Sequence, residues 1–104
     1  MDLEKISLNI ILHGGNARAK AFEALEACKK GDYERADRFL RIAKEEITKA
    51  HVAQTKVLNA EAQGKNVRLN LLFIHSLDIL MIATSEIDLV ECIIELHKTP
   101  QGTQ

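Results

Sequence analysis

A histidine and an aspartate lie three residues apart inside the most apolar stretch of the chain, residues 71–82. Nine of these twelve residues are apolar, and the exceptions are His75, Ser76 and Asp78. On a helix, positions i and i+3 share a face, so the imidazole of His75 and the carboxylate of Asp78 would be neighbours. An imidazole can titrate near neutral pH, and a carboxylate in apolar surroundings can be compensated by a partner group, a proton or a bound cation. The pair is therefore the first candidate for a functional site.

The same pair also has a structural interpretation. A single histidine and aspartate on an apolar helix are usually hydrogen-bonded partners in a core. A helix as apolar as residues 71–82 is expected to be buried on most of its sides. A carboxylate in those surroundings is costly unless it is paired, protonated or bound to a cation. We therefore expect some group to compensate Asp78, with His75 beside it.

The composition indicates one all-α domain. The chain has 104 residues, 46% of them hydrophobic but only 4% aromatic, so its core must be aliphatic and rich in alanine. Such a core favours closely packed helices, and the single proline and five glycines agree with long helices. The chain has 14 basic and 15 acidic residues, which leaves no basic excess for binding nucleic acid.

Three further features predict a cytoplasmic protein. The first residues lack the basic and then apolar pattern of a signal peptide. The apolar run at residues 71–82 is too short to span a bilayer. Cys28 and Cys92 match no zinc-binding or redox spacing, so we expect two reduced, buried thiols.

Apolar residues recur at three- and four-residue steps in three segments, which predicts amphipathic helices over about 3–30, 33–62 and 67–97. Gly14 and Gly15 interrupt the first pattern and indicate a bend or a close helix contact.

The turn between the first two helices has clear end signals. Gly31 suits the left-handed position that closes a helix, and Asp32 suits the N-cap of the next helix. A connection this short makes the two flanking helices antiparallel neighbours.

The predicted fold class is all-α: an antiparallel three-helix bundle over residues 1–98, with a polar, disordered tail at 99–104. Three helices leave little interior for a helix as apolar as the third. Self-association would cover it, with the third helices of several subunits meeting at an axis. Two- or threefold symmetry would bring copies of Asp78 together, and carboxylates held together need protonation or a cation between them.

The early turns of the third helix carry Phe73, Leu77 and Leu80 on the side where its later turns are polar. These residues could form an apolar rim for visiting proteins, or they could fill a subunit interface. Three polar residues of the second helix also have two interpretations, as interhelical contacts or as support for the His75 region. They are His51, Gln54 and Thr55.

Four blocks keep a specific order and spacing along nearly the whole chain. They are Gly15-Asn16-Ala17-Arg18; Gly31-Asp32-Tyr33 with Ala36-Asp37; Ala50-His51 with Gln54-Thr55; and His75 with Asp78 and Leu80-Met81, in a helix that ends Ile94-Glu95-Leu96. Together they resemble the IIA subunit of the lactose/cellobiose (N,N′-diacetylchitobiose) family of the phosphoenolpyruvate-dependent sugar phosphotransferase system.

The resemblance implies a cytoplasmic, three-helical and trimeric phosphotransferase component that serves the uptake of a lactose/cellobiose-type sugar. Members of the family accept a phosphoryl group on one histidine from the phosphocarrier HPr and pass it to a cysteine of the cognate IIB subunit. His75 matches this histidine, so the resemblance makes it the catalytic residue. Asp78 matches a buried aspartate at the trimer axis, where a divalent cation such as magnesium can sit.

The chain departs from the family directly after His75. The family block reads His-Ala-Gln-Asp-His-Leu-Met, whereas Leu77 replaces the glutamine here and Ile79 replaces the second histidine. Neither side chain can donate a hydrogen bond to a phosphoryl group, and losing one such donor can cost about 2.7–4 kcal/mol of transition-state stabilisation. An alternative function is therefore a non-catalytic helical interaction or regulatory module. A third and weaker hypothesis is a helical protein that binds metal through Asp78 and His75.

Overall fold

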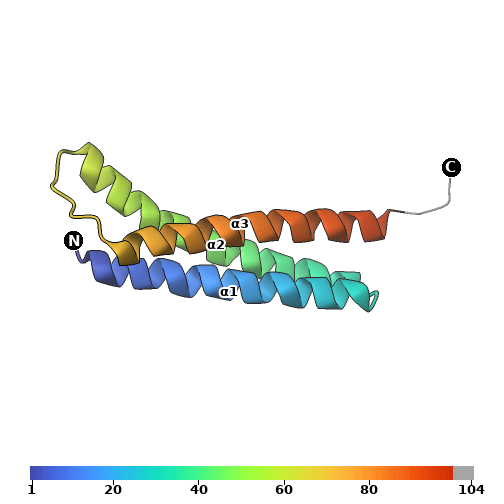
Figure 1. Ribbon diagram of the computed structural model, residues 1–104. Helices are drawn as coiled ribbons and strands as arrows, with labels where there is room; N and C mark the ends of the chain where they lie inside the picture. Colours follow the sequence, from blue (N-terminus) through green and yellow to red (C-terminus); the bar gives the residue numbers. More distant parts are fainter. Residues whose placement is uncertain (100–104) are drawn as a thin grey trace.

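The computed structural model describes residues 1–99, and in it the chain forms α1 (Leu3–Lys29), α2 (Tyr33–Ala62) and α3 (Leu71–Lys98). Figure 1 shows α1 and α3 running in the same direction and α2 running against them. The predicted all-α, antiparallel three-helix bundle is confirmed. The bundle is elongated, with extents of 58 × 23 × 19 Å. Residues 100–104 of the predicted tail lie outside the described residues.

Side-chain caps explain where the helices begin. The carboxylate of Asp32 accepts a hydrogen bond from the backbone N–H of Arg35 at 3.1 Å, as predicted for an N-cap. Gly31 has φ +79°, the left-handed conformation that the turn requires. The third helix was predicted to begin near residue 67, which is wrong. It begins at Leu71 because the side chain of Asn70 accepts from the backbone N–H of Phe73 at 2.9 Å.

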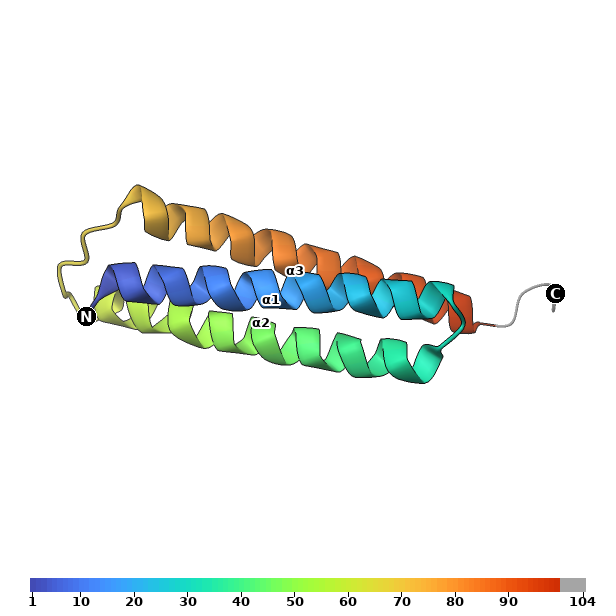
Figure 2. The same cartoon turned by 90° about the horizontal axis from the view of Figure 1, so that it is seen from below.

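The helices pack closely because the core is rich in alanine. α1 lies between the other two helices in Figure 2 and contacts both of them. Towards the α1–α2 turn, small residues let the three helix axes approach one another. The fully buried alanines of this part are Ala17, Ala21, Ala24, Ala36 and Ala43. Towards the other end, larger side chains fill the interior, among them Ile10, Val57, Phe73 and Leu80.

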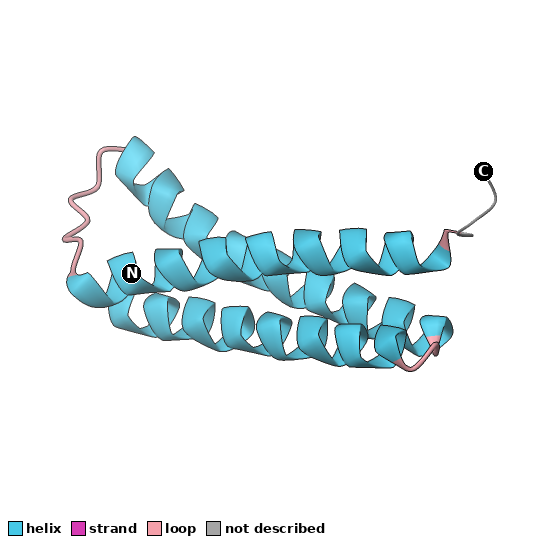
Figure 3. Cartoon of the chain, turned by 45° about the vertical axis from the view of Figure 1, so that its right-hand side comes forward, coloured by secondary structure: helices cyan, strands magenta, loops and turns pink. Residues whose placement is uncertain are grey.

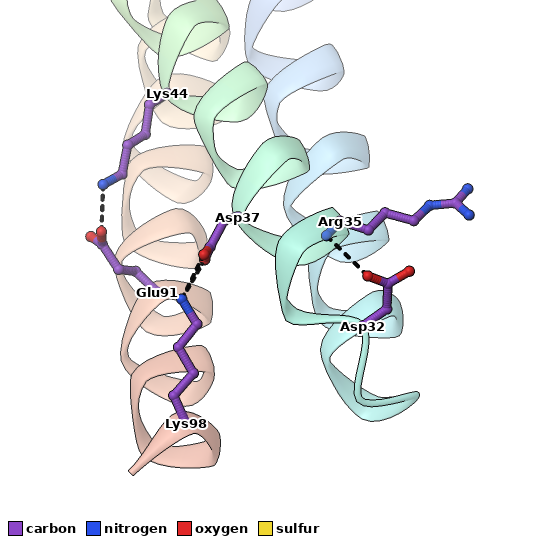
Figure 4. A network of polar contacts seen from close by, with 6 residues as sticks. All are labelled: Asp32, Arg35, Asp37, Lys44, Glu91 and Lys98. Atoms are coloured by element: carbon purple, nitrogen blue, oxygen red, sulfur yellow. Dashed lines mark hydrogen bonds and ion pairs between the residues drawn. The ribbon is translucent and has the colours of Figure 1, made fainter.

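The ion pairs between α2 and α3 that the structure describes, over residues 1–99, lie near the end of the bundle that contains the α1–α2 turn. Lys44 pairs with Glu91, and Lys98 pairs with Asp37 (Figure 4). Towards the other end the two helices diverge, as Figures 1 and 3 show. A groove of about 440 Å³ lies between them there.

The two cysteines, both predicted to be buried, differ in their exposure. Cys28 is a buried free thiol, as expected, but Cys92 is exposed on α3 and was wrongly placed in the core. Among residues 1–99, none of the helices combines the length and the apolar character needed to cross a membrane.

Candidate functional site

Only one side of the apolar segment of α3 is buried. Phe73 and Leu80 are 3% and 2% exposed, and Ser76 between them is fully buried. On the opposite side Leu71 and Met81 are strongly exposed. The prediction that this segment is buried on most sides is therefore wrong for the single chain. The physical reason is that α3 has only two neighbouring helices, so the rest of its circumference faces solvent.

His75 is exposed, in the second turn of α3. Its position relative to α1 follows from Ile79, one turn later on nearly the same face. A Cβ placed on Gly14 of α1 would lie 2.9 Å from Cγ2 of Ile79, so α1 and α3 are in close contact there. Since α1 and α3 run in parallel, the imidazole of His75 lies along the outer edge of the α1–α3 contact. It is therefore open to a visiting protein.

Asp78 is also exposed, on the solvent-facing side of α3. No hydrophobic core surrounds it within one chain, so its carboxylate needs no internal compensation. In residues 1–99 there is no group of three or more histidine, cysteine, aspartate or glutamate side chains that could hold a metal ion. The hypothesis of a monomeric metal-binding protein therefore finds no support within this part of the chain.

Phe73, Leu77 and Leu80 do not form the predicted apolar rim beside His75. Phe73 and Leu80 belong to the core, and Leu77 is half-buried in the groove between α2 and α3. At about 100° per residue, Leu77 points roughly 200° away from His75 around the helix. Within one chain, the leucine that replaces the family's glutamine therefore lies on the far side of α3 from the imidazole.

Ile79 replaces the family's second histidine and has a clear packing role. It is half-buried, and its Cγ2 methyl group lies against Gly14 of α1. The predicted close helix contact at the two glycines is confirmed at Gly14, where α1 continues unbroken. This position near His75 therefore contributes helix packing in place of a polar group.

The polar residues of α2 do not contact His75. His51 and Gln54 line the groove between α2 and α3, on the side of α3 away from the imidazole. The hydroxyl of Thr55 donates to the backbone carbonyl of His51 within its own helix, at 2.9 Å. Within residues 1–99, neither predicted role of these three α2 residues is therefore seen.

A polar cluster between α1 and α2 was missed by the sequence reasoning. The Glu46 carboxylate accepts from Asn16 Nδ2 at 2.9 Å and from Lys49 Nζ at 3.0 Å, and it lies 3.3 Å from His13 Nδ1. Burial raises the pKa of Glu46, but the hydrogen bonds from Asn16, Lys49 and His13 outweigh this effect and lower the pKa to about 2. His13 and Asn16 lie three residues apart, as do Glu46 and Lys49, and this spacing is the only sequence signal of the cluster.

The exposed apolar surface of α3 is also longer than expected. Leu89 and Leu96 in the second half of α3 are largely exposed, on a different side of the helix from the predicted polar side, which includes Asp88 and Glu95. Together with Asp78 in their midst, the exposed apolar residues make a stripe along the whole helix, which we call the α3 stripe. Its apolar members are Leu71, Ile74, Met81, Ile82, Leu89 and Leu96.

Comparison with known proteins gives one consistent family. Residues 5–98 match the family described as the lactose/cellobiose-specific IIA subunit of the phosphotransferase system. A lichenan-specific phosphotransferase enzyme IIA component from Bacillus subtilis is 44% identical over 97 residues, which cover 93% of this chain and 88% of the relative.

Solved structures agree with this result. The cellobiose-specific enzyme IIA from Bacillus anthracis superimposes with a TM-score of 0.89 at 39% identity, covering 94% of this chain and 90% of that one. A chitobiose IIA in complex with HPr, from the Escherichia coli phosphotransferase system, gives a TM-score of 0.81 at 28% identity, covering 94% and 95%.

Proposed function

Because the chain belongs to the lactose/cellobiose-specific IIA subunit family of the sugar phosphotransferase system, we propose that His75 carries its phosphoryl group. The donor is phospho-HPr, the acceptor is a cysteine of the cognate IIB subunit, and the sugar is of the lactose/cellobiose type. The observation that supports this proposal best is the exposure of the His75 imidazole at the position where the family places its carrier histidine. The relative solved in complex with HPr supports the choice of donor.

The chemistry needs a neutral imidazole nitrogen with free access. That nitrogen attacks the phosphorus of phospho-HPr in line, a new N–P bond forms, and the N–P bond to the donor histidine breaks. In the second step the IIB thiolate attacks the same phosphorus, and His75 leaves as neutral imidazole. Each step exchanges one bond to phosphorus for another, so no hydrolysis and no redox partner is involved.

The alternative is a non-catalytic regulatory module, and Leu77 and Ile79 are the reason to consider it. Leu77 faces away from His75 and Ile79 packs on α1, so neither side chain covers the imidazole within one chain. Their placement therefore favours the carrier function over the regulatory one. Efficient onward transfer from the labelled protein to a IIB cysteine would exclude the regulatory module.

A labelling experiment tests the carrier residue. Incubation with enzyme I, HPr and labelled phosphoenolpyruvate should phosphorylate the wild-type chain and leave His75→Ala unlabelled. His97→Ala is the matched control, because His97 is another exposed histidine of α3, with Nδ1 3.0 Å from the backbone carbonyl oxygen of Ile93. Label on His75→Ala would show that another residue carries the group.

We also propose that three chains associate through the α3 stripe. Six exposed apolar side chains gather on this stripe, whereas such residues are normally scattered singly over a monomer surface. Threefold assembly would bring three copies of Asp78 to the axis, where their oxygen atoms would suit a hard divalent cation such as magnesium. Light scattering should then give three times the chain mass of 11.6 kDa. Cys92 lies two heptads after Asp78 on the same face, so a short bis-maleimide should crosslink neighbouring chains at Cys92.

A further inference from the structure

We propose that a second copy of this chain packs antiparallel against the outer face of α1. The contact uses one apolar line of residues, which we call the α1 seam: Leu8, Leu12, Gly15, Ala19 and Phe22. This inference adds an interaction surface that depends neither on the proposed carrier function of His75 nor on the proposed trimer.

The α1 seam is apolar and open to solvent. Leu8, Leu12 and Phe22 are 51%, 56% and 47% exposed, although all three are large and hydrophobic. Gly15 and Ala19 are exposed as well, and a Cβ added to Gly15 would meet nothing within 4 Å. Packing within one chain therefore does not explain why this line of residues is apolar.

The spacing of the seam is that of a coiled coil. Its five residues follow steps of four, three, four and three, which are the a and d positions of a heptad repeat. At about 100° per residue, they lie within about 40° of one line along the helix. Ile10 and Ala17 are fully buried and lie on the opposite side of α1. The seam therefore faces directly away from the core of its own bundle.

Large and small residues alternate along the seam, so that an antiparallel copy fits it. In an antiparallel pair of helices, a positions face d positions, and Leu12 of each copy then packs into the space at Gly15 of the other. The same register sets Leu8 against Ala19. Each leucine thus meets a small residue, which is what close packing of two helices requires. A parallel copy would set Gly15 against Gly15 and leave a void between the helices.

The charges at the two ends of the seam select the same orientation. Lys5 lies one heptad before Leu12, whereas Glu23 and Glu26 lie at the other end. In the antiparallel register, Lys5 of one copy faces Phe22 of the other, where its ammonium group can lie over the ring and beside Glu23. Within residues 1–99, the side chain of Lys5 makes no ion pair. A parallel copy would bring like charges together at both ends.

A hollow beside the seam gives this lysine room. It measures about 810 Å³ and lies between α1 and α2, where Phe22, Glu23 and Glu26 help to line it. Acidic and basic side chains balance in its lining, so the hollow does not favour a free anion or a free cation. These side chains are Lys20, Glu23, Glu26, Lys30, Asp32 and Arg35.

The size of the contact sets its strength. From Lys5 to Phe22 the line is about 26 Å long and a helix is about 10 Å wide, which gives a footprint of roughly 260 Å² on each copy. A standard interface covers about 800 Å² on each partner. We therefore expect weak association that increases with concentration, with a Kd nearer to about 1 mM than to 1 μM.

A zero-length cross-linker tests this contact on the unmodified chain. A carbodiimide joins a lysine directly to a carboxylate, and Lys5 and Glu23 of one chain are about 27 Å apart along α1. A bond between them must therefore join two chains. The proposed trimer cannot supply it, because parallel subunits keep the same separation along their helices. Peptide mass spectrometry should detect the Lys5–Glu23 bond at about 1 mM chain, and its yield should fall steeply on dilution.

Two substitutions in the seam should remove this bond. Leu12→Arg places charges at the centre of the contact, and Gly15→Leu fills the space that Leu12 of the other copy needs. Each should lower the cross-link yield about tenfold or more while the helical circular dichroism signal stays the same. Val52→Arg is the matched control, because Val52 is 55% exposed but lies on α2, and its yield should equal that of the wild type.

Absence of the Lys5–Glu23 bond in the wild-type chain at about 1 mM would overturn the α1 seam as a contact between copies. An undiminished yield in both Leu12→Arg and Gly15→Leu would overturn it as well. Either result leaves the labelling of His75 untouched, so failure of this inference is distinct from failure of the proposed carrier function.

Discussion

Adjacent glycines in α1 should respond in opposite ways to alanine. Both sit in the interior of a helix, where alanine is favoured over glycine by roughly 0.5–1 kcal/mol. At Gly15 the added methyl group meets nothing within 4 Å, so Gly15→Ala should stabilise the protein by about that amount. At Gly14 the methyl group would lie 2.9 Å from Cγ2 of Ile79.

The size of the effect at Gly14 follows from that contact. The Cγ2 atom belongs to a β-branched side chain with a restricted rotamer, so it cannot move aside easily. Forcing an extra methyl group into a packed contact typically costs about 1–3 kcal/mol. Gly14→Ala should therefore be about 1–3 kcal/mol less stable than Gly15→Ala. The two variants share the same gain in helix propensity, so their difference isolates the steric cost.

Urea unfolding monitored by the helical circular dichroism signal measures this difference. The protein concentration must be equal for all variants, because association shifts the apparent stability. For a domain of about this length, each kcal/mol should also move Tm by about 4–8 °C.

A double mutant identifies the source of the effect. Ile79→Leu keeps the side-chain volume but removes the branch at Cβ, so Gly14→Ala should cost much less in that background. Equal stability of the Gly14→Ala and Gly15→Ala variants in the wild-type background would refute the reasoning. The reasoning would also fail if their difference in stability were unchanged in the Ile79→Leu background.

Two further predictions concern charged residues. In the folded protein the pKa of Glu46 is lowered to about 2, against an ordinary value of 4.5. The contribution of Glu46 to folding stability is therefore complete above about pH 4.5 and is lost as the pH falls towards 2. Glu46→Gln should therefore lower stability near neutral pH and weaken the dependence on pH in that window, measured by urea unfolding at several pH values. In a buffer free of divalent cations, Asp78→Leu should keep the oligomer mass and keep or raise Tm, because it removes repulsion between the carboxylates that the proposed trimer brings together. A large drop in Tm would indicate a paired, structural Asp78.

Much of the fold follows from local sequence signals. The turn at Gly31 and Asp32 was predictable because one position needs a left-handed backbone and the next a capping carboxylate. The start of α3 was missed because Val67 and Leu69 resume an apolar pattern, while the capping side chain of Asn70 decides the boundary.

The orientation of α3 was harder to predict. Almost every position from 71 to 82 is apolar, so periodicity alone cannot say which side faces the core. Two small residues, Ser76 and Ala83, mark the buried side, because close packing of helices leaves no room for larger ones. That signal would have placed Phe73 and Leu80 inside.

The candidate site was also predictable only in part. His75 was chosen because the sequence resembles a known family, and the structure adds that His75 is exposed and lies beside α1. The cluster around Glu46 could not be predicted, since pairing between helices depends on their relative register, which the sequence of one helix does not encode.

The elongated shape determines where the phosphoryl groups would lie in the proposed trimer. His75 lies near one end of a rod 58 Å long. A threefold cyclic assembly keeps its subunits parallel, so all three imidazoles would sit at the same pole and the opposite pole would carry none. Such a trimer would accept phosphoryl groups at three histidines near one of its ends. At saturation it would hold one phosphoryl group per chain.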